Sequence, residues 1–199
     1  MIELTPLTLQ GKVVRLVPME EAHARALAEV ALEPRIWQHM AYGNVDSEET
    51  LRGFMRLLLA RQAQGTDLCF TVLHRQSGKP IGCTRYMNID VGDRGVEIGG
   101  TFYGLAYQRT GVNTESKYLL LRHAFEVWAC IRVQLKTDLA NARSQAAIER
   151  LGAVKEGILR NHMVLPTGRI RDTVVYSIID SEWPDVKARL EGFMERPLP

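Results

Sequence analysis

The segment between residues 96 and 151 constrains the fold of this chain more than any other. Its pattern of apolar and polar residues predicts a strand at 96–103, a long apolar helix at 112–128, a strand at 131–137 and a helix at 141–151. Two strands that are joined through a helix pair in parallel, because the helix returns the chain to the same end of the sheet. Both strand-to-helix junctions therefore fall on one edge of the sheet, where open α/β sheets bind ligands.

The rest of the chain predicts antiparallel strands and amphipathic helices around this unit. Strands at 68–74, 80–90 and 96–103 follow one another through tight turns, as in an antiparallel meander. The other predicted elements are a strand at 12–17, helices at 19–31 and about 46–64, strands at 153–164 and 171–179, and a short helix after residue 182. The spacing of Asp46 and Glu49 predicts a capping box for the second helix.

These elements predict an α/β (α+β) fold in a single domain at 1–199, with a core at about 8–190 and a C-terminal tail at 191–199. The expected sheet is mixed, mostly antiparallel and built of about seven strands, with helices on both faces. The last hairpin and the tail around Phe193 and Met194 could pair with a second copy, so a homodimer is one option.

Charge and cysteine content exclude several classes of protein. The 199 residues include 25 basic and 23 acidic side chains, a formal charge of +2, which disfavours a nucleic-acid or membrane-surface binder. No window reaches the ~18 apolar residues of a membrane span, and the first residues do not resemble a secretory signal. Three cysteines without a CxxC pair favour a reducing, cytoplasmic location, and five histidines without ligand spacing predict no metal site.

The first strand-to-helix junction reads Gln108-Arg109-Thr110-Gly111-Val112-Asn113-Thr114-Glu115. A helix start has backbone N–H groups without partners and the positive end of the helix dipole, and a glycine there lets a ligand approach. The junction therefore suits an anionic phosphate. The alternative is a plain loop in which Asn113 or Thr114 caps the helix.

A second polar junction follows about thirty residues later, from Asp138 through Asn141 to Ser144. With this second junction added to the first, the chain resembles the GNAT superfamily of acyl-coenzyme-A-dependent N-acyltransferases. The resemblance is closest to the branch that acetylates the N-termini of ribosomal proteins. The family's phosphate loop, Gln/Arg-x-x-Gly-x-Gly/Ala, is matched except for its last position, which is Asn113 here. Four further motifs match in order: Glu97-Ile98-Gly99, Asn141-x-x-Ser144, Leu151-Gly152-Ala153 with Glu156-Gly157, and Arg171-Asp172 with Tyr176-Ser177.

The resemblance implies that acetyl-CoA is the cosubstrate. It places the pyrophosphate on the N–H groups of about residues 109–114, and the pantetheine arm between the strands at 96–103 and 131–137, which splay apart in the family. The cofactor-binding residues that it implies are Phe102, Tyr103, Gln108, Arg109, Thr110, Gly111, Val112, Asn113, Thr114 and Asn141.

The implied reaction is a direct attack of an amine on the thioester in a ternary complex. Glu97 is then the base, directly or through water, and a backbone N–H near Phe102 is the donor to the oxyanion. Ser144 is the acid, with Asn141 as an alternative or as a pantetheine ligand. The tyrosine acid that many members carry is replaced by Ile148 here, which leaves the serine as the acid or no acid at all, since a thiolate departs without much help.

Each of these assignments has a purely structural alternative. Glu97 could be a strand carboxylate that pairs with an arginine or faces solvent, Asn141 could only cap its helix, and Ser144 could only pack.

The resemblance implies an amine acceptor, either a protein N-terminus or a small molecule. We expect it to lie against the irregular loop at 33–44 and the last hairpin, although aromatic and Met side chains there could also be core residues. The candidate acceptor-binding residues are Trp37, Met40, Tyr42, Arg160, His162 and Tyr176. A catalytically silent acyl-CoA sensor and a transferase for another acyl-CoA, such as succinyl-CoA, remain alternatives.

Overall fold

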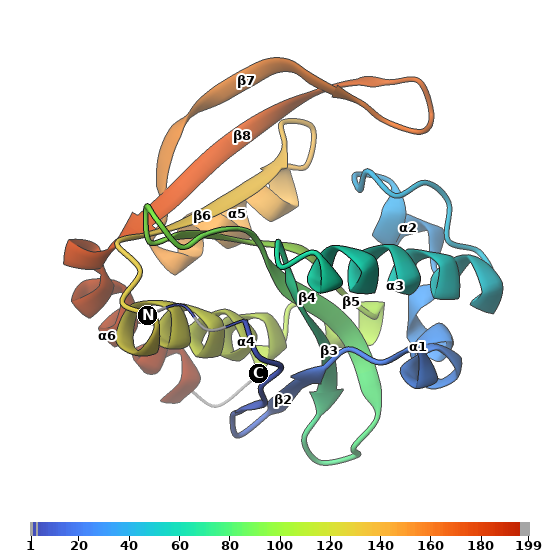
Figure 1. Ribbon diagram of the computed structural model, residues 1–199, viewed down its shortest axis with the longest axis horizontal. Helices are drawn as coiled ribbons and strands as arrows, with labels where there is room; N and C mark the ends of the chain where they lie inside the picture. The colour runs from blue at the N-terminus through green and yellow to red at the C-terminus, as the bar shows by residue number, and fades with distance from the viewer. Residues whose placement is uncertain (1, 3, 196–199) are drawn as a thin grey trace.

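A mixed sheet with strand order β1-β2-β3-β4-β5-β6-β8-β7 runs through the centre of the computed structural model, which describes residues 2 and 4–195 (Figure 1). The strands are β1 (Leu9–Gln10), β2 (Val14–Pro18), β3 (Leu68–His74), β4 (Pro80–Asp90), β5 (Gly95–Tyr103), β6 (Arg132–Asp138), β7 (Val154–Val164) and β8 (Ile170–Ile179). The sheet has eight strands and not seven. The additional strand, β1, has two residues, which is too short for an alternating pattern to be visible in the sequence.

Helices cover both faces of the sheet, as the sequence predicts. The helices are α1 (Ala24–Ala31), α2 (Pro34–Trp37), α3 (Glu48–Ala63), α4 (Gly111–Arg122), α5 (Ala142–Leu151) and α6 (Trp183–Glu195). Side chains of α1 and α3 share one hydrophobic cluster, and side chains of α4, α5 and α6 share the other. The predicted tail is helical as far as Glu195, and its Pro-rich end lies outside the described residues. No helix in the described part of the chain is long and apolar enough to cross a membrane.

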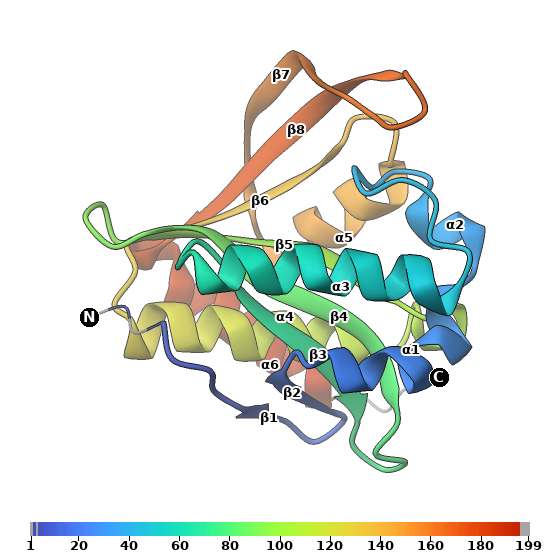
Figure 2. The same cartoon turned by 45° about the vertical axis from the view of Figure 1, so that its right-hand side comes forward.

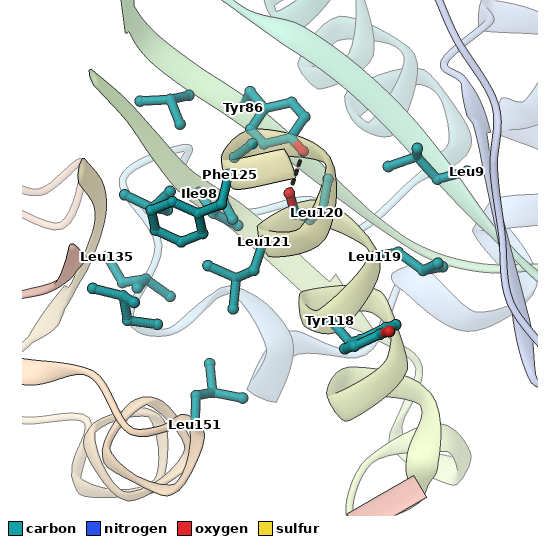
Figure 3. Close-up of a cluster of buried hydrophobic side chains, with 14 of the residues drawn as sticks. Leu9, Tyr86, Ile98, Tyr118, Leu119, Leu120, Leu121, Phe125, Leu135 and Leu151 are labelled. Atoms are coloured by element: carbon teal, nitrogen blue, oxygen red, sulfur yellow. Dashed lines mark hydrogen bonds between the residues drawn. The ribbon is translucent and has the colours of Figure 1, made fainter. Parts of the chain in front are cut away.

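The larger cluster packs α4 against the centre of the sheet (Figure 3). Leu119, Leu120 and Leu121 are almost fully buried there against strand residues such as Ile98. The Tyr86 hydroxyl on β4 donates a hydrogen bond of 2.6 Å to the Leu120 carbonyl, which satisfies its polar group inside the core. Helix α4 is therefore held firmly over the strands that bear the candidate site.

Strands β5 and β6 pair in parallel, as the strand–helix–strand order predicts. Their register joins only three residue pairs, Gly95–Arg132, Val96–Val133 and Glu97–Gln134. Beyond these pairs β5 continues beside β4 while β6 turns away beside β8, so the two strands diverge (Figure 2). The splay expected from the family resemblance is therefore present, and it leaves the facing edges of β5 and β6 without a partner among the described strands.

Candidate active site

A cleft of about 560 Å³ opens where β5 and β6 diverge. Its walls come from β5 and β6, from the segment between β5 and α4, from α5, from the loop after α2, and from β7 and β8. The two strand-to-helix junctions lie at this cleft together, because the parallel pair puts both strand ends on one edge. Gln108 links them: its Nε2 donates to the Tyr103 carbonyl (2.9 Å), and its Oε1 accepts from Arg143 Nη1 on α5 (2.8 Å).

The helix start at this cleft is capped by Thr110. The Thr110 hydroxyl accepts from the Val112 N–H (3.3 Å), and α4 begins at Gly111. The sequence-based alternative of an Asn113 or Thr114 cap is therefore wrong. Arg109 precedes the cap with a left-handed φ of 61°, and its guanidinium has no partner among the described residues. N–H groups in a first helical turn, with a free cation beside them, are suited to a phosphate.

The structure brings most of the predicted cofactor residues to the cleft. Phe102, Tyr103, Gln108, Arg109, Thr110, Asn113 and Asn141 all line it. Gly111 and Thr114 face a second hollow, between the turn after β1, α4 and α6, and Val112 is buried. Thr114 also accepts a hydrogen bond from Arg150, which ties α4 to α5.

Glu97 lines the cleft as a buried carboxylate with an asymmetric set of partners. Its Oε2 accepts from Asn88 Nδ2 (2.8 Å) and Gln134 Nε2 (3.3 Å), and lies 2.8 Å from Lys136 Nζ. Its Oε1 has no hydrogen-bond partner among the described residues. The structural alternative for Glu97 is a pair with an arginine. A cationic partner is present, but it is Lys136 and not an arginine. The second carboxylate oxygen, Oε1, stays open to the cleft.

Asn141 and Ser144 lie together at the start of α5. The Asn141 Oδ1 accepts from the Ser144 N–H (3.0 Å), so Asn141 does cap the helix. The Asn141 amide NH₂ and the Ser144 hydroxyl have no hydrogen bonds to the described residues, and both side chains line the cleft. They remain available to a ligand.

The candidate acceptor-binding residues divide into two groups. Met40, Tyr42 and His162 line the cleft. The other three, Trp37, Arg160 and Tyr176, do not line it. Trp37 is in the core, where its Nε1 donates to the Ala31 carbonyl (2.7 Å), and Arg160 is exposed on β7. Tyr176 is fully buried, and its hydroxyl donates to Glu149 (3.0 Å).

A polar cluster at the end of β6 closes one side of the cleft. Asp138 is buried, and its carboxylate accepts from Arg169 and from the Ala140 N–H (2.9 Å). Burial opposes its ionisation, but these hydrogen bonds outweigh burial and lower the pKa of Asp138. Arg171 donates to the His39 carbonyl (3.3 Å) and so joins β8 to the loop after α2.

Sequence reasoning missed several cleft residues, among them the cations Lys117, Lys136 and Arg171. Lys117 lies on α4 and is 6% exposed, although a lysine in an amphipathic helix is expected to face water. Its position within the first turns of a helix that follows a phosphate-type junction is the signal that could have identified it. In the described part of the chain, no group of three or more His, Cys, Asp or Glu side chains is arranged to hold a metal ion.

The amino-acid sequence and the fold of this chain are similar to those of known acetyltransferases. The model of the acetyltransferase (GNAT) domain matches residues 14–154. A Bacillus subtilis (strain 168) protein that bears the name ribosomal N-acetyltransferase YdaF is 31% identical over 112 residues. That match covers 55% of this chain and 59% of YdaF, so it spans less than two thirds of the relative.

Solved structures share the fold over almost the whole chain. A structure from T. thermophilus, assigned to the acetyltransferases, has a TM-score of 0.87 and 38% identity, and the match covers 96% of this chain and 98% of that one. Mycobacterium smegmatis RimJ, solved in complex with CoA-disulfide, has a TM-score of 0.77 and 22% identity, covering 96% and 93% of the two chains.

Proposed function

The chain belongs to the acetyltransferase (GNAT) family, and we propose that it transfers an acetyl group from acetyl-CoA to a primary amine. The observation that carries this proposal is the cleft between β5 and β6, with an unpaired strand edge on one side and the capped start of α4 at its end. A long, flexible thioester with a pyrophosphate at one end matches both features. The β5 edge offers backbone hydrogen bonds to the amides of the arm, and the helix start offers N–H groups to the phosphates.

In the proposed complex, the pyrophosphate lies against the N–H groups of residues 109–114, with Arg109 beside it. The pantetheine arm lies along β5 near Phe102 and Tyr103, and the Asn141 amide is free to bind one of its carbonyl groups. The complex of the RimJ structure with CoA-disulfide supports this role for the fold.

The acceptor amine loses a proton before it attacks the thioester carbonyl. An α-ammonium has a reference pKa of about 8, so a carboxylate or a water that it holds is able to take that proton. We assign this role to Glu97, because its Oε1 is free while Oε2 is fixed by Asn88, Gln134 and Lys136. A backbone N–H near Phe102 stabilises the oxyanion, and the free Ser144 hydroxyl donates a hydrogen bond at the sulfur.

The acceptor enters between the loop after α2 and the β7–β8 hairpin, where Met40, Tyr42 and His162 line the cleft. A protein N-terminus is the favoured acceptor, since YdaF bears the name of a ribosomal N-acetyltransferase. The proposed location is the cytoplasm, which the three free, buried cysteines support.

An acceptor screen with detection of the released thiol tests this function. Purified protein is mixed with acetyl-CoA and with N-terminal peptides of ribosomal proteins, amino acids, polyamines or aminoglycosides. We expect thiol release that depends on one class of amine, and a matching gain of one acetyl group in the mass of that amine. A Glu97→Gln, Ser144→Ala double variant is expected to lose turnover and keep its affinity for acetyl-CoA. Binding of acetyl-CoA without turnover on any amine would favour the sensor alternative.

A further inference from the structure

Lys117 is a buried cation in the cleft that the mechanism above does not use. It lies on α4, two turns after the Thr110 cap, and is 6% exposed, yet it lines the cleft. Its Nζ donates one hydrogen bond, of 2.8 Å, to the Thr101 hydroxyl on β5. Thr101 is in turn 2.7 Å from the Thr84 hydroxyl on β4. An ammonium has three N–H groups, so two of them have no partner among the described residues.

No carboxylate of the described chain compensates the charge of Lys117, in contrast to the other cleft lysine, Lys136, which pairs with Glu97. The one titratable group that acts on it in the described part of the chain is the Cys83 thiol on β4, and burial raises the pKa of this thiol to about 12, so it is neutral. Burial lowers the pKa of Lys117 to about 7. A buried, unpaired cation destabilises a fold, and a Met of similar length would avoid this cost.

The position of Lys117 meets a chemical need that α5 leaves open. Ile148, which lines the cleft from α5, has no proton to give, and the Ser144 hydroxyl is a far weaker acid than an ammonium. A thiolate has a reference pKa of about 8.5, and an acid with a pKa near the working pH transfers a proton to it most effectively. Lys117 lines the same cleft from α4 and contacts Thr101 of β5, the strand along which the arm is proposed to lie.

We propose that Lys117 is the proton donor to the sulfur of the leaving coenzyme A. When the tetrahedral intermediate collapses, the C–S bond breaks and its electron pair goes to sulfur. An N–H bond of the Lys117 ammonium then breaks, and its proton forms the thiol of free coenzyme A. The neutral amine regains a proton from solvent, and the acceptor nitrogen has released its own protons through Glu97. This assignment rests on the proposed acetyl transfer.

The first test needs no acceptor. Coenzyme A is bound to the full chain, and the ultraviolet absorbance of its thiolate is followed against pH in the wild type, Lys117→Met and Lys117→Arg. A permanent cation beside the sulfur is expected to lower the pKa of the bound thiol by about 1 or more in Lys117→Arg, relative to Lys117→Met. The wild type is expected to show a smaller lowering, because burial lowers the pKa of Lys117 to about 7 and its ammonium loses a proton over the same pH range. Equal thiol pKa values in all three proteins would overturn the assignment. Failure of coenzyme A to bind the wild type would instead contradict the proposed function.

The second test separates proton transfer from a fixed charge. With the best amine of the acceptor screen, Lys117→Met and Lys117→Arg are both expected to lower kcat by about 10²-fold with KM for acetyl-CoA unchanged, since a guanidinium does not give up its proton. Lys155→Met, on the exposed β7 strand, is the control and is expected to keep wild-type kcat. Full activity of Lys117→Arg would overturn the role of proton donor, and a rise in KM alone would show a cofactor-binding lysine. Thermal unfolding of each variant shows that it is folded.

Discussion

The two buried carboxylates Asp138 and Glu97 of the cleft have different bonding patterns, and the difference decides which of them is free to react. Both oxygens of Asp138 accept hydrogen bonds, from Ala140 N–H and from Arg169, so this side chain fixes the end of β6 and the hairpin. Glu97 concentrates its donors on Oε2 and leaves Oε1 open to the cleft. This difference supports Glu97 as the proposed base, while the hydrogen bonds of Asp138 connect β6 to the hairpin.

Replacing Glu97 by Gln tests that assignment. The amide is close in size to the carboxylate but does not accept a proton, so kcat is expected to fall by about 10²- to 10⁴-fold while the Kd for acetyl-CoA stays the same. The control is Glu126→Gln, because Glu126 forms an ion pair of the same length, 2.8 Å to Lys187, away from the cleft. Equal losses of kcat in both variants would show a general effect of lost ion pairs.

Lys117 makes the stability of the protein depend on pH. Its pKa is about 7 in the folded chain and near 10.5 in the unfolded chain, because burial disfavours the ammonium. Between these values the unfolded chain binds more protons, so this residue makes stability rise with pH. Lys117→Met is thus expected to be more stable than the wild type at pH 7, by up to about 5 kcal/mol, with the gain shrinking towards pH 10. Denaturant unfolding at several pH values measures the difference in the free energy of unfolding between the variant and the wild type. A difference that does not change with pH would contradict a buried, desolvated lysine.

At the scale of the elements, Glu115 anchors the helix that carries the proposed phosphate site. It lies in the second turn of α4, and its carboxylate accepts the N–H groups of residues 12, 13 and 14, each at 2.7 Å. These groups lie in and directly after the turn between β1 and β2, and one carboxylate satisfies all three. The start of α4 is therefore fixed against the sheet before any ligand arrives.

The contact of Glu115 with the turn between β1 and β2 requires a glycine at position 11, and replacing Gly11 tests this contact. A Cβ at Gly11 would overlap the Glu115 carboxylate, so Gly11→Ala is expected to lower the free energy of unfolding by about 1–3 kcal/mol. Gly53 in α3 is the matched control, because nothing in the described part of the chain lies within 4 Å of the Cβ that it would gain. Gly53→Ala is expected to stabilise by about 0.5–1 kcal/mol, through helix propensity. The account of the anchor fails if both changes act in the same direction.

The order and type of the elements could be predicted from the sequence, because apolar periodicity is a local signal. The caps of α3 and α4 could not, although Asn141 caps α5 as one sequence-based alternative had it. The α3 cap is Ser47, bonded to Thr50, one residue after the predicted Asp46–Glu49 pair. The α4 cap is Thr110 and not Asn113 or Thr114. Each region has several residues able to cap, and the backbone path alone selects among them.

For the whole molecule, the splay of β5 and β6 decides which residues form the site. It could be expected from a family resemblance, but the side chains that face it depend on packing between distant segments. Trp37 and Tyr176 lie in candidate segments and yet point into the core, whereas Lys117, a residue type that is mostly exposed on helices, faces the cleft. A one-dimensional pattern does not distinguish these cases, because an apolar or aromatic residue suits a core and a ligand wall equally.

The unpaired strand edges predict a local change on ligand binding. Backbone N–H groups on the β6-facing edge of β5, after Glu97, have no partner strand in the described part of the chain. Their hydrogen exchange is expected to slow when acetyl-CoA binds, because the pantetheine arm covers them. The β7–β8 pairing lies outside the arm's path and serves as the internal reference, with unchanged exchange. Slowing confined to the β7–β8 hairpin would place the ligand elsewhere.

A crystal structure of the protein with coenzyme A would show where the cofactor lies in the cleft and in which direction it runs. We expect pyrophosphate oxygens within hydrogen-bond distance of the N–H groups of residues 109–114, the pantetheine arm between β5 and β6, and the sulfur beside Lys117. Coenzyme A bound in the second hollow between α4 and α6, or outside the cleft altogether, would contradict this placement.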